Sequence, residues 1–118
     1  MEHNALFWEC LEKLVRENEI IIDRPKGTKH PKFEKIVYVV DYGYINGTSS
    51  MDNSGIDIFV GTDPNKNIDS IICTIDLLKK DSEIKILMGC TETEKVEIYN
   101  FLNNSEYMKA LMVKRSKI

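Results

Sequence analysis

Acidic residues stand at or beside the ends of several segments that have the pattern of strands. Five of them would form an oxygen-rich site if those ends converge: Asp23, Asp52, Asp57, Asp81 and Glu83. Mg²⁺ and Mn²⁺ are hard cations that bind oxygen ligands, so this set is a candidate metal site. The simpler interpretation is that acids at strand ends are solvated turn residues, and composition alone does not separate the two.

Lysine and tyrosine side chains accompany these acids. They are Lys26, Lys32, Lys85, Tyr38, Tyr42 and Tyr44. A phosphoryl group needs its charge neutralised and its oxygens held, and a metal ion near it can activate water. Acids, lysines and phenols together therefore indicate a site for a phosphorylated small molecule, although each lysine taken singly is better explained as a surface charge.

Two helices are expected to flank the elements that position these side chains. Apolar residues recur at helical spacing over residues 4–18, with Asn4 as the N-cap, and predict an N-terminal amphipathic helix. The stripe expected to face the core consists of Phe7, Leu11, Leu14 and Val15. Thr91 and Glu94 have the spacing of a capping box and predict a second helix that ends near residues 103–104.

Between and after the helices, β-branched and alternating segments predict strands. Their ranges are 20–22, 36–40, 55–60, 71–78, 83–88 and 108–113. A bend is expected at residues 41–43, and the last range is also compatible with a short helix. Sequential strands joined by hairpins favour an α+β fold in which an antiparallel sheet curls into a small barrel.

Length, charge and cysteine usage exclude several classes of protein. A chain of 118 residues predicts one domain, and a formal net charge of −3 without a dense basic block argues against a nucleic-acid-binding face. No apolar run approaches the roughly 20 residues of a membrane span, and the N-terminus does not have the pattern of a signal peptide. Three cysteines without C-x-x-C spacing favour reduced thiols and a cytoplasmic location. The oligomeric state stays open, but exposed apolar residues on the first helix would favour a homo-oligomer.

The sequence of residues 22–90 resembles that of a known protein family. Residues 38–48, Tyr-Val-Val-Asp-Tyr-Gly-Tyr-Ile-Asn-Gly-Thr, are similar to the Tyr-Pro-x-Asp-Tyr-Gly-Phe-Ile-x-x-Thr of soluble family I inorganic pyrophosphatases. Shorter matches lie in the same order at residues 22–27, 32–34, 52–57 and 81–85. The second of these, Lys-Phe-Glu, resembles the family's Lys-Tyr-Glu, and the third stands where the family has Asp-Gly-Asp-Pro-Leu-Asp.

This resemblance implies a function and a set of roles. The function is Mg²⁺-dependent hydrolysis of inorganic pyrophosphate to phosphate by metal-activated water, with Mn²⁺ as the alternative metal. The fold would be a five-stranded OB-like barrel with helices outside it, in a single pyrophosphatase-like domain over residues 1–118. Matched positions make Asp52, Asp57, Asp81 and Glu83 metal ligands, with Asp23 at an acidic metal-site position. Three residues match phosphate contacts of the family, namely Lys32, Tyr42 and Lys85. Lys26, which stands near the matched positions in the sequence, is a further candidate for substrate binding.

Departures from the family pattern define the alternative. Ser54 stands at a signature position where the family has an Asp that helps to deprotonate the nucleophilic water, and serine is a poor substitute. Asp41 is a candidate to replace this missing base. The candidate catalytic residues are therefore Asp41, Asp52 and Asp57. Only three residues separate Glu34 from Tyr38, so the family's hairpin with a phosphate-binding Arg has no counterpart. The alternative is a degenerate relative that binds a divalent metal and a phosphorylated ligand without turnover, or a structural or interaction subunit.

Overall fold

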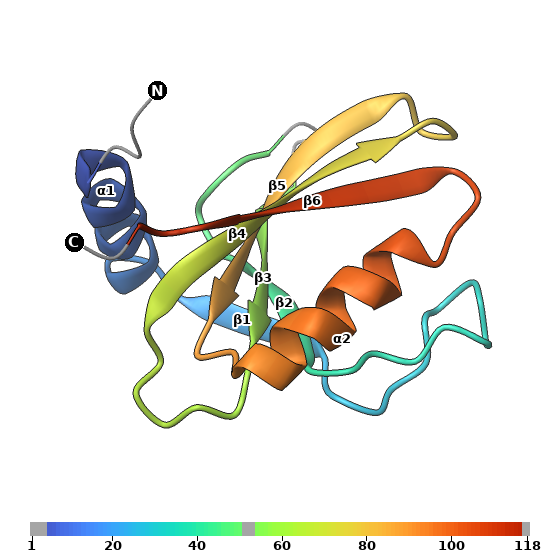
Figure 1. Ribbon diagram of the computed structural model, residues 1–118, viewed down its shortest axis with the longest axis horizontal. Helices are drawn as coiled ribbons and strands as arrows, with labels where there is room; N and C mark the ends of the chain where they lie inside the picture. The colour runs from blue at the N-terminus through green and yellow to red at the C-terminus, as the bar shows by residue number, and fades with distance from the viewer. Residues whose placement is uncertain (1–4, 51–53, 117–118) are drawn as a thin grey trace.

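The structure is a computed structural model that describes residues 5–50 and 54–116. Within these residues the chain forms two helices and six strands (Figure 1). In chain order they are α1 (Ala5–Arg16), β1 (Ile20–Arg24), β2 (Asp41–Ile45), β3 (Ile56–Val60), β4 (Ile68–Asp76), β5 (Asp81–Met88), α2 (Glu92–Asn103) and β6 (Met108–Lys114). The predicted α+β class with flanking helices is confirmed.

The six strands form one mixed sheet in the order β1-β2-β3-β5-β4-β6. All neighbouring strands are antiparallel except β3 and β5, which are parallel. Over the described residues β1 and β6 are the outer strands and do not pair, so the predicted barrel of about five antiparallel strands is not confirmed. The parallel pair arises because the β4–β5 hairpin inserts β5, rather than β4, next to β3.

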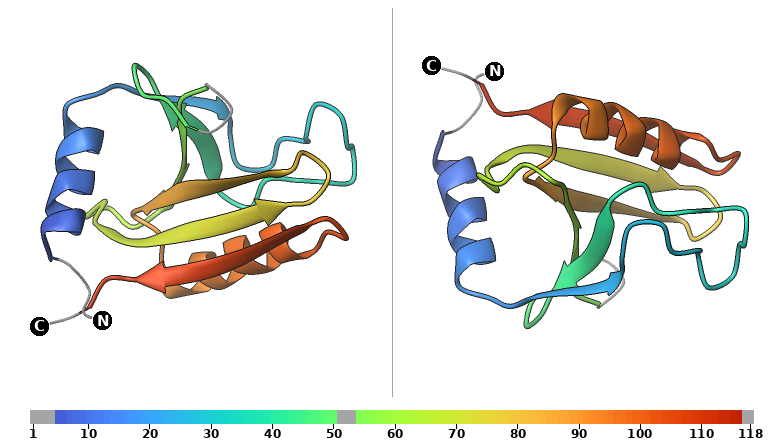
Figure 2. Two further views of the ribbon diagram at one scale, coloured as in Figure 1. Left: turned by 90° about the horizontal axis from the view of Figure 1, so that it is seen from above. Right: turned by 90° about the horizontal axis from the view of Figure 1, so that it is seen from below.

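The sheet buries both of its faces. On β3 and β5 successive residues point to opposite sides, so Ile58 and Ile86 face one cluster while Phe59 and Leu87 face another. Val15 of α1 packs in the first cluster, and α2 packs in the second. Figure 2 shows α1 standing at one end of the sheet and α2 lying along β6. Apolar burial of this kind is the main favourable contribution to folding.

Three sequence predictions about single elements are confirmed or refined. Thr91 and Glu94 form both hydrogen bonds of a capping box, and α2 ends at Asn103 as expected. The ambiguous last segment is a strand, β6. The core stripe of α1 is rotated relative to the prediction, because Trp8 is buried and Phe7 is exposed. The predicted N-cap Asn4 lies outside the described residues.

The predicted strand over residues 36–40 is wrong. Residues 25–40 form a long loop with one isolated bridge between Lys29 and Val37, and the strand begins only at Asp41. Ile36 and Val37 are exposed, whereas Tyr38 and Val40 are buried in the loop's contact with the rest of the protein. The β-branched residues of this run therefore pack a loop against the protein and do not form the hydrogen-bond ladder of a strand.

Gly43 allows β1 and β2 to approach closely. It pairs with Ile22 in the antiparallel register of these strands. A Cβ atom added at Gly43 would lie 1.9 Å from the backbone oxygen of Ile21, and backbone atoms of a paired strand have little freedom to move away. Only glycine fits this position without displacing β1.

We expect Gly43→Ala to destabilise the protein by about 2 kcal/mol, the usual cost of overpacking a site that cannot relax. Urea unfolding followed by circular dichroism measures the change. Thr93→Ala, at an exposed position on α2, is the control and should shift the free energy of unfolding by less than about 0.5 kcal/mol. Equal unfolding midpoints for Gly43→Ala and the wild type would contradict this account of the β1–β2 contact.

Glu94 connects α2 to the loop between β3 and β4. Its Oε1 accepts hydrogen bonds from the backbone N–H groups of Thr91 at 2.9 Å and Thr62 at 3.1 Å. Its Oε2 accepts one from the Thr62 hydroxyl at 2.9 Å. Burial of Glu94 opposes ionisation, but these hydrogen bonds outweigh it and hold the pKa of the carboxyl below its usual value.

A carboxyl whose pKa is lowered by folding stabilises the protein above its unfolded pKa of about 4.3, and this contribution is lost as the pH falls through the folded value. We expect Glu94→Gln to lower the free energy of unfolding by about 1 to 2 kcal/mol at pH 7. The difference from wild type should shrink below pH of about 4. Chemical unfolding across this pH range measures it, with the exposed Glu97→Gln as control. A pH-independent difference would refute the linkage.

Candidate functional site

The ammonium group of Lys85 is the centre of a polar network that joins three strands. Its Nζ donates a hydrogen bond to the Tyr42 hydroxyl at 2.9 Å. The same atom forms ion pairs with Asp57 Oδ2 at 2.7 Å and with Glu83 Oε2 at 3.2 Å. Four of the residues singled out in the sequence therefore meet at one point, from β2, β3 and β5.

The register of the sheet explains this meeting. On β5, Glu83 and Lys85 are two residues apart and point to the same face as Leu87. Leu87 packs with Phe59 and α2 in the second core cluster, called here the α2-side cluster. The parallel pairing of Ile58 with Ile86 puts Asp57 beside Lys85, one step back on each strand. Tyr42 reaches the same face from β2, opposite Phe59. Alternating side chains of three neighbouring strands thus build the network on one face.

The protonation states of the network follow from burial and charge. Lys85 is only 5% exposed, and burial by itself would lower its pKa. Tyr42 and Asp57 outweigh that effect and raise the pKa of Lys85 above its usual value, so the ammonium stays charged. Burial, together with Asp57, raises the pKa of the Tyr42 phenol, so this hydroxyl stays neutral. Two carboxylates beside one ammonium leave one formal negative charge at the site.

An aromatic wall with a second cation adjoins the network. The Tyr42 ring stacks on Tyr38 with centroids 5.1 Å apart and packs against Phe59 at 4.7 Å. Arg24 donates a hydrogen bond to the Tyr38 hydroxyl, and its Cζ lies 5.5 Å from the Tyr38 ring centroid and 5.9 Å from that of Tyr42. His30 also stacks on Tyr38, with its ring centroid 6.4 Å from that of Tyr38.

Sequence reasoning missed Arg24. Its residue type gave no local signal, because it stands in a polar segment beside Pro25 and Lys26. The β1–β2 register pairs Arg24 with Tyr42, and the irregularity between Ile22 and Arg24 leaves Asp23 out of the ladder. Only this register places the guanidinium beside the network.

Other predicted site residues do not join the network. Asp23 is exposed at the β1 irregularity, and Asp81 lies opposite Asp76 at the tip of the β4–β5 hairpin. Asp41 accepts a hydrogen bond from the backbone N–H of Lys26 at 2.8 Å, so its carboxylate orders the start of the loop. The side chains of Lys26 and Lys32 are exposed on that loop. Asp52 lies outside the described residues.

The predicted five-acid metal centre is not formed by the part of the chain that the structure describes, where no group of three or more His, Cys, Asp or Glu residues has the arrangement of a metal site. Of the members of this set that the structure describes, Asp57 and Glu83 come together, with Lys85 between them. Mg²⁺ is commonly held by one or two carboxylates together with the phosphate oxygens of a substrate. The chemistry of this donor set suits a magnesium ion that arrives with a phosphate ligand, and does not suit one held by these two side chains alone.

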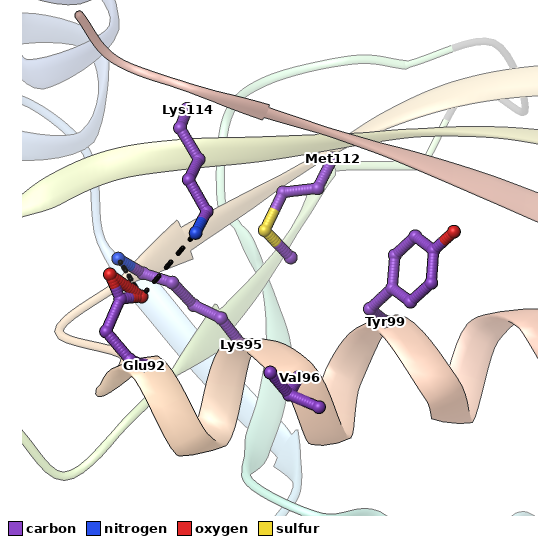
Figure 3. A pocket seen from close by; sticks show the side chains of 6 residues that line it. All are labelled: Glu92, Lys95, Val96, Tyr99, Met112 and Lys114. Carbon is purple, nitrogen blue, oxygen red and sulfur yellow. Dashed lines mark ion pairs between the residues drawn. The ribbon is translucent and has the colours of Figure 1, made fainter.

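A hollow of about 220 Å³ lies elsewhere, between α2 and β6. Figure 3 shows Lys95 and Lys114 both directed at Glu92 across it, with Tyr99 and Met112 on its apolar side. Glu92 Oε2 lies 3.2 Å from Lys95 Nζ and 3.8 Å from Lys114 Nζ, so the charges of this hollow are paired. It shares no lining residue with the Lys85 network.

No protein-family model and no curated protein matches this chain. Among the described helices, neither is long and apolar enough to cross a membrane.

We expect Lys85→Met to lower the free energy of unfolding by about 3 kcal/mol, because it leaves two acids near each other without their shared cation. A lysine whose pKa is raised by folding contributes fully at every pH below its unfolded value of about 10.4, so the loss should be the same at pH 6 and pH 8. Chemical unfolding at both pH values measures it. Lys35→Met, on the exposed loop, is the control, and an equally small effect of both variants would contradict the role of Lys85.

Proposed function

We propose that this protein binds a phosphoanhydride together with Mg²⁺ and hydrolyses it, with inorganic pyrophosphate as the substrate. The observation that carries the proposal is the convergence of Tyr42, Asp57, Glu83 and Lys85 in one network from three strands. Each of these positions also matches a functional position in the pyrophosphatase resemblance. Kinship with that family, an OB-like origin of the curled sheet and a cytoplasmic location belong to the same proposal.

The side chains of the network have distinct roles in this proposal. Lys85 and Tyr42 donate hydrogen bonds to the oxygens of one phosphoryl group and offset the charge that gathers on them. Asp57 and Glu83 would hold the magnesium ion, which would supply charge neutralisation and lower the pKa of a water molecule. The water oxygen bonds to one phosphorus atom as its proton passes to Asp57, while the bridging P–O bond breaks and the second phosphate leaves.

A second candidate is binding without turnover. The observation that favours it is the ion pairing of Lys85 with both acids, which occupies the carboxylates that a metal ion would need. Ser54 in place of the middle acid of the family's signature supports it as well. Under this alternative the protein binds a phosphorylated ligand, with or without a divalent cation, and serves as a sensor or subunit.

Phosphate release from pyrophosphate tests the first candidate directly. We expect release by the wild type with Mg²⁺ or Mn²⁺, no release with EDTA, and a loss of about a hundredfold or more in Asp57→Asn, which cannot accept the proton. Glu97→Gln, an exposed acid on α2, is the matched control and should retain the wild-type rate within about twofold. Wild-type release no greater than that of Asp57→Asn would rule out the hydrolase.

Calorimetric titration with methylenediphosphonate, which is not hydrolysed, then separates the two candidates from a purely structural role. Heat of binding in a wild type that releases no phosphate would support the second candidate. Neither binding nor release would leave the network as a structural element, and both candidate functions would be wrong.

A further inference from the structure

Arg24, at the edge of the network, is a cation that no carboxylate among the described residues pairs with. No ion pair among the described residues includes it, although Asp23 precedes it in the chain and is near enough to favour its charged form. The hydrogen bond to the Tyr38 hydroxyl uses one of the five N–H groups of a guanidinium. The side chain is half-buried, with its guanidinium beside the rings of Tyr38 and Tyr42, and neither of these ring contacts supplies a carboxylate.

Arg24 and Lys85 both lie near the ring of Tyr42. The Cζ of Arg24 lies 5.9 Å from the Tyr42 centroid, and the Nζ of Lys85 lies 5.4 Å from it. The two cations differ in their surroundings, because the Lys85 ammonium is paired with two acids and the Arg24 guanidinium with none of the described ones. A ligand with two anionic groups in sequence would bring one group to each cation.

Further positive charge gathers on the Arg24 side. His30 lies against Tyr38 and Phe33, with ring centroids 6.4 Å and 5.1 Å away. Burial lowers the pKa of His30, and the charges of Arg24, Lys32 and Lys79 lower it further. These cations come from β1, from the loop over residues 25–40 and from the β4–β5 turn. Their repulsion would be relieved by a bound anion on this side of the site.

We propose that Arg24 binds the second phosphoryl group of a ligand that carries two adjacent phosphoryl groups, while Lys85 and Tyr42 bind the first. This inference rests on the anionic ligand of the proposed function and names the residue that selects a diphosphate over a single phosphate. A guanidinium suits this role because its planar fork can donate two parallel hydrogen bonds to phosphate oxygens. Arg24 transfers no proton and acts as a specificity residue.

Calorimetric titration in the presence of Mg²⁺ tests it with two probes, methylenediphosphonate and orthophosphate. We expect Arg24→Gln to weaken binding of the diphosphonate about tenfold to a hundredfold, and to change that of orthophosphate by less than about threefold. Arg24→Lys should recover part of the diphosphonate affinity, since it restores the charge without the fork. Lys35→Gln, on the exposed loop, is the control for removal of a nearby positive charge.

The outcomes separate this inference from the proposed function. If the wild type binds the diphosphonate but releases no phosphate from pyrophosphate, a selective loss in Arg24→Gln still supports the inference while hydrolysis is wrong. If the wild type hydrolyses pyrophosphate and Arg24→Gln has unchanged KM and diphosphonate affinity, the inference is wrong while hydrolysis stands. Equal weakening of both probes in Arg24→Gln, or no diphosphonate binding by the wild type, also overturns it. Thermal unfolding of each variant verifies that it is folded before titration.

Discussion

A buried ammonium group has to be paired, and the pairing of Lys85 governs how three strands of this protein meet. Removing such a charge from water is costly unless opposite charges and hydrogen bonds compensate it. Asp57 comes from β3, Glu83 from β5 itself and Tyr42 from β2, so the ammonium is satisfied only in this strand order. The parallel β3–β5 pair, the least expected feature of the sheet, is the one that brings Asp57 to Lys85.

The same network is continuous with the apolar core. The ring of Tyr42 packs on Phe59 in the α2-side cluster, and Tyr38 packs on Phe101 of α2 with ring centroids 5.3 Å apart. The polar ends of these side chains face the Arg24 and Lys85 cations while their rings face the core. The packed rings therefore fix the positions of the hydroxyl groups that take part in the network.

Part of the site could be predicted from the sequence. Residue type, spacing and resemblance predict four site residues that do converge: Tyr42, Asp57, Glu83 and Lys85. Arg24 was missed, since its place depends on the β1–β2 register and on the irregularity at Asp23. The sequence predicts a catalytic role for Asp41, whereas in the structure its carboxylate accepts a hydrogen bond from the backbone N–H of Lys26. Residue type indicates what a side chain can do, and only its neighbours decide whether it does so.

By itself the sequence determined the local elements of this protein. The capping box at Thr91, the alternation of β5 and the stop near Asn103 act over a few residues, so local interactions are enough to specify them. The tertiary structure alone decided which strands are neighbours, that the sheet is open and mixed over the described residues, and that residues 36–40 lie in a loop. It also decided that Asp57 and Glu83 share one cation while Asp23 and Asp81 stand apart. The reason is that partner choice between strands depends on which faces bury together and which charges are paired, and these contacts join residues far apart in the chain.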